Sequence, residues 1–232
     1  MKNRILVWDW PTRVFHWSLA LSFLGAYVTS EMDDYRAVHM VFGYLLAGLV
    51  GFRLIWGVWG SRHARFSSFV RAPAAVLTYL RSLLRPEPEH HVGHNPAGAV
   101  AIILMLGLGV ATAFLGWATY SDLGGEWAED LHEGLANVML AVVLVHILGV
   151  IVSSFLHREN LPVAMLSGYK NAENEAPIAS GHSVMAVVLV AAMAWFAWAL
   201  WQGKLPILLD PTVVAARAES GTHHHQQDKD DD

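Results

Sequence analysis

The chain has 232 residues, of which 54% are hydrophobic and only 15% charged, with a formal net charge of −5. Soluble domains carry about 25% charged residues. The deficit here falls in long apolar runs, which indicate membrane-spanning segments rather than a soluble fold. The chain contains no cysteine, which excludes disulfides, iron–sulfur clusters and covalently attached c-type haem. We expect no nucleic-acid partner.

Five apolar segments are long enough, or nearly so, to cross a bilayer. Their predicted bounds are about 14–30, 37–59, 97–120, 131–156 and 184–201. An apolar segment in lipid has to satisfy its own backbone hydrogen bonds, so each is predicted to be a helix. We therefore predict an all-α integral membrane protein, built as a four-helix bundle with a fifth transmembrane helix.

The rest of the chain divides around these spans. The segment at about 73–84 is too short to span a bilayer and is predicted to be an amphipathic helix lying on the membrane surface. Residues 1–171 then form the transmembrane bundle domain, and 172–203 form a linker with the fifth span. The polar tail at 204–232 is expected to be disordered, and its histidines, 223–225, are excluded from any site.

Charge is distributed unevenly between the two sets of loops. Lysine and arginine gather on one side, which holds Lys2, Arg4, Arg13, Arg62, Arg65, Arg71, Arg81, Arg85, Arg158 and Lys170. The opposite loops are mainly acidic and contain Glu31, Asp33, Asp34, Arg36, Asp122, Glu126, Glu129 and Asp130. The basic loops and the N-terminus are therefore expected in the cytoplasm of a bacterial inner membrane. Tryptophans near the span ends, Trp8 and Trp56 among them, indicate an aromatic belt.

Four histidines lie inside or at the start of predicted spans, where ionisable residues are rare and usually functional. His132 and His146 are 14 residues apart on one predicted helix. This spacing is about 3.9 turns and about 21 Å, so both side chains face nearly the same direction close to opposite membrane surfaces. Depth then assigns their partners: His16 can meet His146 on the cytoplasmic side, and His39 can meet His132 on the outer side.

Two histidine pairs at two depths fit two b-type haems, each with its iron between two neutral imidazoles. Filled axial positions favour electron transfer over oxygen chemistry, so we assign no catalytic residue. A separation of about 21 Å on one helix excludes a single zinc cluster. A haem-free, proton-coupled transporter is the alternative outside redox chemistry. The remaining histidines near span ends are expected to be solvated: His63, His90, His91, His157 and His182.

Arg53 follows His39 by 14 residues on the second predicted span. It therefore shares the face of His39 but lies at cytoplasmic depth, where a buried arginine can pair with the propionates of the inner haem. An arginine that reaches out to the membrane surface is the alternative. Glycines on the second and third spans make room for close helix packing or for a macrocycle, and these are Gly43, Gly48, Gly51, Gly107, Gly109 and Gly116.

Four local motifs match a known family: TRVFHW at His16, the helix start at His39, GHNP at 93–96, and the His132/His146 helix followed by SGYKN. Over about residues 5–171, the chain resembles bacterial b-type cytochromes of the cytochrome b561 family. The resemblance is to the branch with the cytochrome b subunit of nickel–iron hydrogenases and the gamma subunit of formate dehydrogenase. It implies four core helices, one haem on His16 and His146, and another on His39 and His132.

The resemblance also implies quinone exchange near the cytoplasmic haem. Asn95 lies in the region where the formate dehydrogenase relatives use an asparagine to line their quinone pocket. A glutamine that follows in those relatives has no counterpart here. Asn95 followed by Pro96 is also the ordinary beginning of a helix.

The expected function is electron transfer between the quinone pool and a periplasmic redox partner, a c-type cytochrome first and a hydrogenase second. Acidic outer loops suit a partner with a basic patch. A superoxide:quinone oxidoreductase that needs no protein partner is the alternative, although acidic loops repel an anion. The family core does not need the fifth span, which is expected to guide partner docking or homo-oligomerisation within the membrane lipid.

Overall fold

The computed structural model describes residues 3–172, 175–202 and 204, and its fold is almost entirely helical. The long helices are α1 (Trp10–Thr29), α2 (Arg36–Trp59), α5 (Pro96–Tyr120), α6 (Glu126–His157) and α8 (Ser183–Trp201). The short elements are η1 (Asp33–Tyr35), α3 (Phe66–Phe69), α4 (Pro73–Ser82) and α7 (Leu161–Ser167), with strands β1 (Asn3–Leu6) and β2 (Tyr169–Ala172). The predicted all-α class is confirmed. The predictions for the tail concern residues that, apart from Lys204, lie outside this description.

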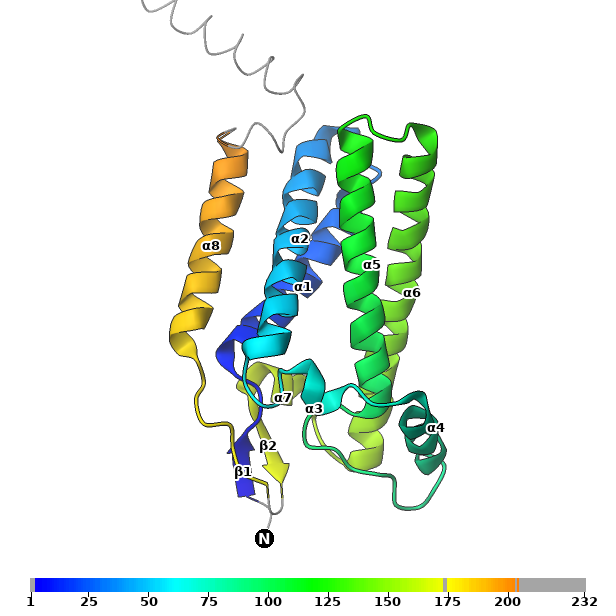
Figure 1. Ribbon diagram of the computed structural model, residues 1–232, viewed down its shortest axis with the longest axis vertical. Helices are drawn as coiled ribbons and strands as arrows, with labels where there is room; N and C mark the ends of the chain where they lie inside the picture. Colours follow the sequence, from blue (N-terminus) through cyan, green and yellow to red (C-terminus); the bar gives the residue numbers. More distant parts are fainter. Residues whose placement is uncertain (1–2, 173–174, 203, 205–232) are drawn as a thin grey trace, which may run out of the picture.

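Four long helices stand side by side, with α1 packed along α2, α5 along α6, and α2 against α5 (Figure 1). The fifth, α8, lies beside α1 and α2 at the edge of the bundle. The elements α3, α4, α7, β1 and β2 gather at one end (Figure 1). This end carries most of the arginines and is called the basic end below. The connections between α1 and α2 and between α5 and α6 form the opposite, acidic end.

Within the part of the chain that the structure describes, four helices are long and apolar enough to cross a membrane by length and composition: α2, α5, α6 and α8. α1 lies in the same bundle but is less apolar, because it carries Arg13 and His16. The segment predicted to lie on the membrane surface is also helical. It forms α4, which ends at Ser82.

The polar residues at the helix starts explain where the helices begin. Asp9 precedes α1 and accepts a hydrogen bond from the Thr12 N–H at 2.9 Å. Asn95 precedes α5 and accepts from the Gly98 N–H at 2.7 Å, while Pro96 occupies the first turn. Each side-chain oxygen satisfies an amide that the first helical turn leaves without a partner.

A two-stranded antiparallel sheet, which the sequence did not predict, joins the N-terminus to the segment after α7. β1 pairs with β2 from Asn3 opposite Ala172 to Leu6 opposite Tyr169. The carbonyl of Gly168 then accepts hydrogen bonds from the N–H groups of Val7 and Trp8. Gly168 has a φ of 88°, a conformation that glycine adopts without strain. The sheet fixes the basic end of α1 beside the end of α6 and α7.

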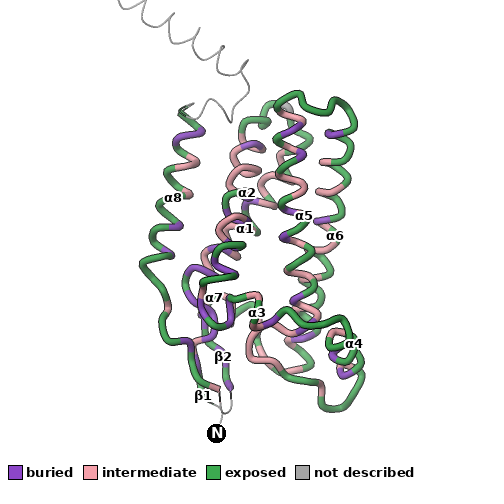
Figure 2. Tube along the Cα trace, viewed as in Figure 1, coloured by how far each residue is buried: buried purple, intermediate pink, exposed green. Residues whose placement is uncertain are grey.

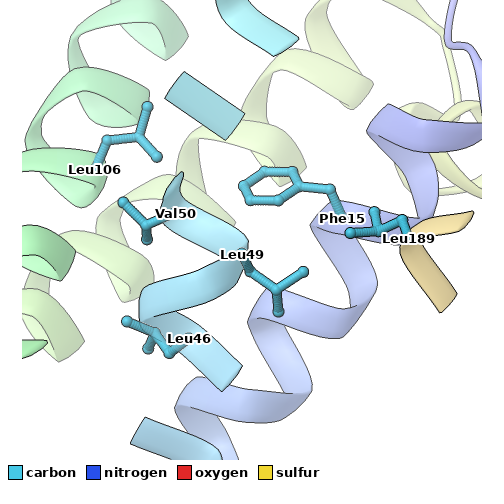
Figure 3. Packing of buried hydrophobic residues seen from close by; sticks show 6 residues of the cluster. All are labelled: Phe15, Leu46, Leu49, Val50, Leu106 and Leu189. Carbon is cyan, nitrogen blue, oxygen red and sulfur yellow. The ribbon is translucent and has the colours of Figure 1, made fainter. Parts of the chain in front are cut away.

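The central apolar cluster lies where α1, α2, α5 and α8 meet (Figure 3). It contains Phe15, Leu46, Leu49, Val50, Leu106 and Leu189. Outside it, large apolar side chains remain exposed along α6 and α8 (Figure 2). Such surfaces suit lipid, in which helices associate through close packing rather than through burial from water.

The tryptophans near the helix ends divide into two groups. Trp59 and Trp127 are exposed, as expected for a belt at the membrane surface. Trp8 and Trp56 are buried, so their assignment to the belt is wrong. The Trp56 indole instead donates to Asp9 Oδ2 at 3.0 Å, which fixes the start of α1 against the end of α2.

Candidate functional site

His39 and His132 meet at the acidic end of the bundle. Their ring centres are 6.2 Å apart and the ring planes are inclined at 78°. His39 lies in the first turns of α2, and His132 lies near the start of α6. The structure therefore brings together two imidazoles from helices that are distant in sequence.

Each of these imidazoles is oriented by a backbone carbonyl of a neighbouring helix. His39 Nδ1 lies 2.8 Å from the carbonyl oxygen of Ala26 in α1. His132 Nδ1 lies 2.9 Å from the carbonyl oxygen of Thr112 in α5. When Nδ1–H donates to a carbonyl, the lone pair of a neutral imidazole is on Nε2, which is a good metal ligand. All four bundle helices thus contribute to this pair.

The separation of the two rings fits a metal held between them. A metal–imidazole bond is about 2.0 Å long. Two rings whose centres are 6.2 Å apart are near enough for both imidazoles to reach one ion placed between them. The donor set, two imidazole nitrogens from different helices, suits haem iron.

Two glycines leave space around the outer pair. A Cβ added to Gly116 of α5 would lie 2.8 Å from His132 Cε1, so any side chain there would displace the imidazole. A Cβ added to Gly43, one turn after His39, would meet no atom within 4 Å. Gly116 therefore permits close contact, while Gly43 leaves open space beside the histidine.

His16 and His146, the two other histidines of the predicted pairs, both lie closer to the basic end. His16 lies in the second turn of α1, and His146 lies in the second half of α6. The two side chains interact electrostatically. His16 Nδ1 is buried and has no hydrogen-bond partner among the described residues. The spacing of about 21 Å along the unbroken helix α6 places this pair well below the outer one.

Arg53 is buried near the basic end, with 3% of its surface exposed. Its guanidinium carbon lies 4.8 Å from the centre of the Phe66 ring. Within the described part of the chain, Arg53 Nη1 has no hydrogen-bond partner. The neighbouring carboxylate of Asp9 is already occupied by Thr12 N–H and the Trp56 indole. A buried cation with an unsatisfied N–H fits an anionic group such as a haem propionate better than it fits a surface-reaching arginine.

His94 is a candidate that the sequence analysis missed. Its ring lies between those of Trp8 and Phe69, with both ring centres at 4.6 Å. Burial, and then the charge of Arg53, lower the pKa of His94 to about 3, so the side chain is neutral. Its Nδ1 is buried without a partner among the described residues. The signal in the sequence was the GHNP motif, in which only the asparagine received a role.

Asn95 caps α5, as the helix-start interpretation predicted. Because its Oδ1 accepts the amide of Gly98, its side-chain amide group is free to donate elsewhere. It lines a small cavity at the basic end together with His90 and His157. The expectation that the span-end histidines are solvated is wrong for His63, which is 8% exposed.

The chain is similar to proteins of one known family. A family model described as prokaryotic cytochrome b561 matches residues 7–168. A probable Ni/Fe-hydrogenase B-type cytochrome subunit from Azotobacter chroococcum mcd 1 is 27% identical, covering 76% of this chain and 92% of that protein. Proteins with the same description are 23% identical in Rhodobacter capsulatus, covering 75% and 84%, and 27% identical in Cupriavidus necator, covering 71% and 86%. No solved structure matches the chain.

Proposed function

Because the chain belongs to the prokaryotic cytochrome b561 family, we propose that it carries electrons between a nickel–iron hydrogenase and the membrane quinone pool through two b-type haems. Membership of this family and the four apolar helices among the described residues make the chain a multi-pass membrane protein and an electron-transfer cytochrome b, with haem b as cofactor. The observation that carries the proposal beyond this is the placement of His39 and His132 together at one depth of the bundle, with His16 and His146 at another.

In this proposal His39 and His132 hold the outer haem, and His16 and His146 hold the inner one. When bound, haem b supplies reversible exchange of one electron at its iron. Each pair would hold its haem through two imidazoles and would leave no room for other iron ligands. The carbonyls of Ala26 and Thr112 hold the outer imidazoles in the tautomer that ligates through Nε2.

Arg53 and Asn95 serve the inner end of the proposed pathway. Arg53 supplies a buried positive charge for the carboxylates of the inner haem, which supports electron uptake there. Asn95 lies beside His94, which interacts electrostatically with both His16 and His146. Its free amide can donate a hydrogen bond to a quinone oxygen at the basic end. The basic end faces the cytoplasm in this proposal, so the N-terminus is inside.

The names of the relatives favour a hydrogenase over a c-type cytochrome as the periplasmic partner, which reverses the order expected from the sequence alone. The acidic end, with Glu126 and Glu129 exposed at the start of α6, suits a partner with a basic patch. Family membership also favours a cytochrome over the haem-free transporter. No observation here specifically favours the superoxide reaction.

The test is the haem content of single-histidine variants of the full chain, purified in detergent. We expect the wild-type protein to contain two b-type haems per chain. His146→Ala should remove the inner haem alone, and His39→Ala the outer haem alone, because each substitution deletes one of the two imidazoles that would hold that haem. A pyridine haemochrome assay and low-temperature absorption spectra measure the number and identity of the haems.

The control is His182→Asn, in an exposed position with a φ of 50° that asparagine tolerates. It should keep both haems. A folded wild-type protein with a single haem, or a His146→Ala variant that keeps two, would refute the pairing. Failure of ubiquinone or menaquinone to reoxidise the reduced haems would refute the quinone assignment while leaving the pairing intact.

A further inference from the structure

A small cavity of about 30 Å³ lies at the basic end, apart from the two histidine pairs. It is enclosed by the segment before α5, the end of α6 and the chain around α7 and β2. The side chains that matter here are His90, His91, Asn95, His157, Glu159 and Lys170, all of which line it. Five of these six are titratable, and the sixth is the residue assigned above to quinone binding.

Glu159 is the centre of this cluster. Its Oε1 accepts a hydrogen bond from His90 Nε2 at 3.0 Å, and its Oε2 forms an ion pair with Lys170 Nζ at 2.9 Å. Burial alone would raise the pKa of Glu159, but the hydrogen bonds and charges of His90 and Lys170 lower it to about 2. Glu159 is therefore ionised at neutral pH, and it fixes the tautomer of His90.

The cluster leads from water to the interior. The side chain of His90 is 40% exposed, that of Glu159 is 17% exposed, and that of Lys170 is 4% exposed. The ring of His157 lies 5.4 Å from that of His90. Lys170 also donates to the backbone carbonyl of His91 at 3.3 Å, which joins the inner part of the cluster to the segment leading to Asn95.

A structural ion pair alone would require only Glu159 and Lys170. The added features are two histidine rings in edge-on contact, a cavity, and His91, whose buried Nε2 makes no hydrogen bond within the described residues. No group of three His, Asp or Glu side chains converges to hold a metal ion in the part of the chain that the structure describes. Histidine is the side chain that accepts and releases protons near neutral pH.

We propose that His90, His157 and His91, organised by Glu159 and Lys170, conduct protons between water at the basic end and a quinone bound at Asn95. This inference rests on the proposed quinone reaction. Reducing a quinone to a quinol takes up two electrons, which the redox partner supplies through the cytochrome, and two protons, which must come from water. Oxidation of the quinol releases both in reverse, and the histidines carry the protons in either direction.

Other charged groups also face the cluster. Glu89 lies 3.9 Å from His91 Nε2 as an ion-pair partner, and Arg71 opposes protonation of His91. Burial is the main effect on His91 and lowers its pKa, so His91 is mostly neutral and able to accept a proton. The wild-type rate with quinol should therefore depend on pH over the range in which histidines titrate.

The test compares two reductants on the full-length haem protein in liposomes. Decylubiquinol reduces the haems only with release of protons, whereas dithionite needs no proton exchange with the protein. In His90→Gln, the amide can still donate to Glu159 but cannot carry a proton. We expect haem reduction by decylubiquinol to slow by about 100-fold and to lose its pH dependence, while dithionite reduction and the haem spectrum stay unchanged.

His90→Ala with added imidazole separates proton transfer from structural support, and His182→Asn is the matched control. The proposal predicts that millimolar imidazole restores a large part of the rate. Three results would each overturn the relay. They are haem-reduction rates equal to those of the control, slower haem reduction with both reductants, and a slow variant whose rate imidazole does not restore. A wild-type protein that decylubiquinol cannot reduce would instead overturn the quinone assignment itself.

Discussion

Single residues decide whether the outer histidine pair can bind a metal at all. In α5, Gly116 lies against the His132 ring, and Thr112 one turn earlier supplies the carbonyl that holds its Nδ1. A methyl group at Gly116 would have to displace either the ring or the helix. The hydrogen bond that sets the tautomer would then lengthen, and Nε2 would turn away from the iron position.

We therefore expect Gly116→Ala to lower the occupancy of the outer haem several-fold and to leave the inner haem in place. Gly107→Ala is the matched control on the same helix, because a Cβ there would meet no atom within 4 Å. Haem content and the two sets of absorption bands measure the effect. Full occupancy in Gly116→Ala would show that the His132 ring tolerates displacement.

Arg53 should set the potential of the inner haem, because a buried positive charge favours the reduced state. Substituting Arg53 with Gln removes this charge, and we expect the midpoint potential of the inner haem to fall by about 60 mV, a tenfold change in a one-electron equilibrium. Redox titration followed optically measures the shift. Arg62→Gln, in an exposed ion pair at the same end, should leave both potentials unchanged.

The residues also show what a sequence can and cannot reveal. The spacing of His132 and His146 predicted that both lie on one face of a helix. This prediction needs no knowledge of the tertiary structure. His63 and His94 could not be recognised as buried, because they lie in the irregular segments before α3 and before α5, whose paths depend on distant packing partners. His94 is enclosed by Trp8 from the start of the chain and by Phe69 from α3.

The helices themselves were largely predictable, since apolar length is a local property of the chain. The bounds of α2 and α5 differ from those predicted by a single residue at their starts. α1 begins earlier than predicted because Asp9 caps it and Pro11 fits its first turn. The strands β1 and β2 were not predictable, because each is four residues long and pairs with a segment over 160 residues away.

The fifth long helix is separable from the haem site in this fold. α8 lies beyond the range that the family model matches and contributes Leu189 to the central apolar cluster. All four histidines, and the carbonyls that hold the outer pair, lie between α1 and α6. A chain that ends after Gly181 keeps the hydrogen bond from the Trp10 N–H to the Gly181 carbonyl.

We expect this truncated chain to retain both haems with unchanged spectra but to unfold at a lower temperature. The loss of Leu189 alone exposes part of a packed cluster, and comparable core truncations cost about 2–5 kcal/mol. Haem content and thermal unfolding in detergent provide the measurement. Loss of the inner haem on truncation would instead assign α8 a direct part in the site.

On the scale of the whole molecule, charge and histidines are distributed along one axis. The basic end contains α3, α4 and the sheet, and the acidic end contains the two turns between long helices (Figure 1). The sequence predicted this polarity because loop charge can be counted without a fold. It paired the histidines by depth but could not give the separation of the His39 and His132 rings, since that depends on how far each helix extends into the bundle.

The carbonyls that hold His39 and His132 also imply an order of assembly. His39 and its acceptor Ala26 belong to the first helical hairpin, whereas His132 and its acceptor Thr112 belong to the second. Each hairpin can thus orient its own outer histidine before the two meet. His16 belongs to the first hairpin and His146 to the second, so each haem would link the two hairpins.

A chain cut between Arg85 and Pro86 should therefore reassemble on its cofactor. Produced separately, fragments 1–85 and 86–232 each carry one histidine of every pair and should hold no bis-histidine haem. Produced together, they should co-purify with two haems per complex, which haem content and size-exclusion chromatography would measure. The haems would then hold the two fragments together, and the connection between α2 and α5 would serve mainly to keep them in one chain.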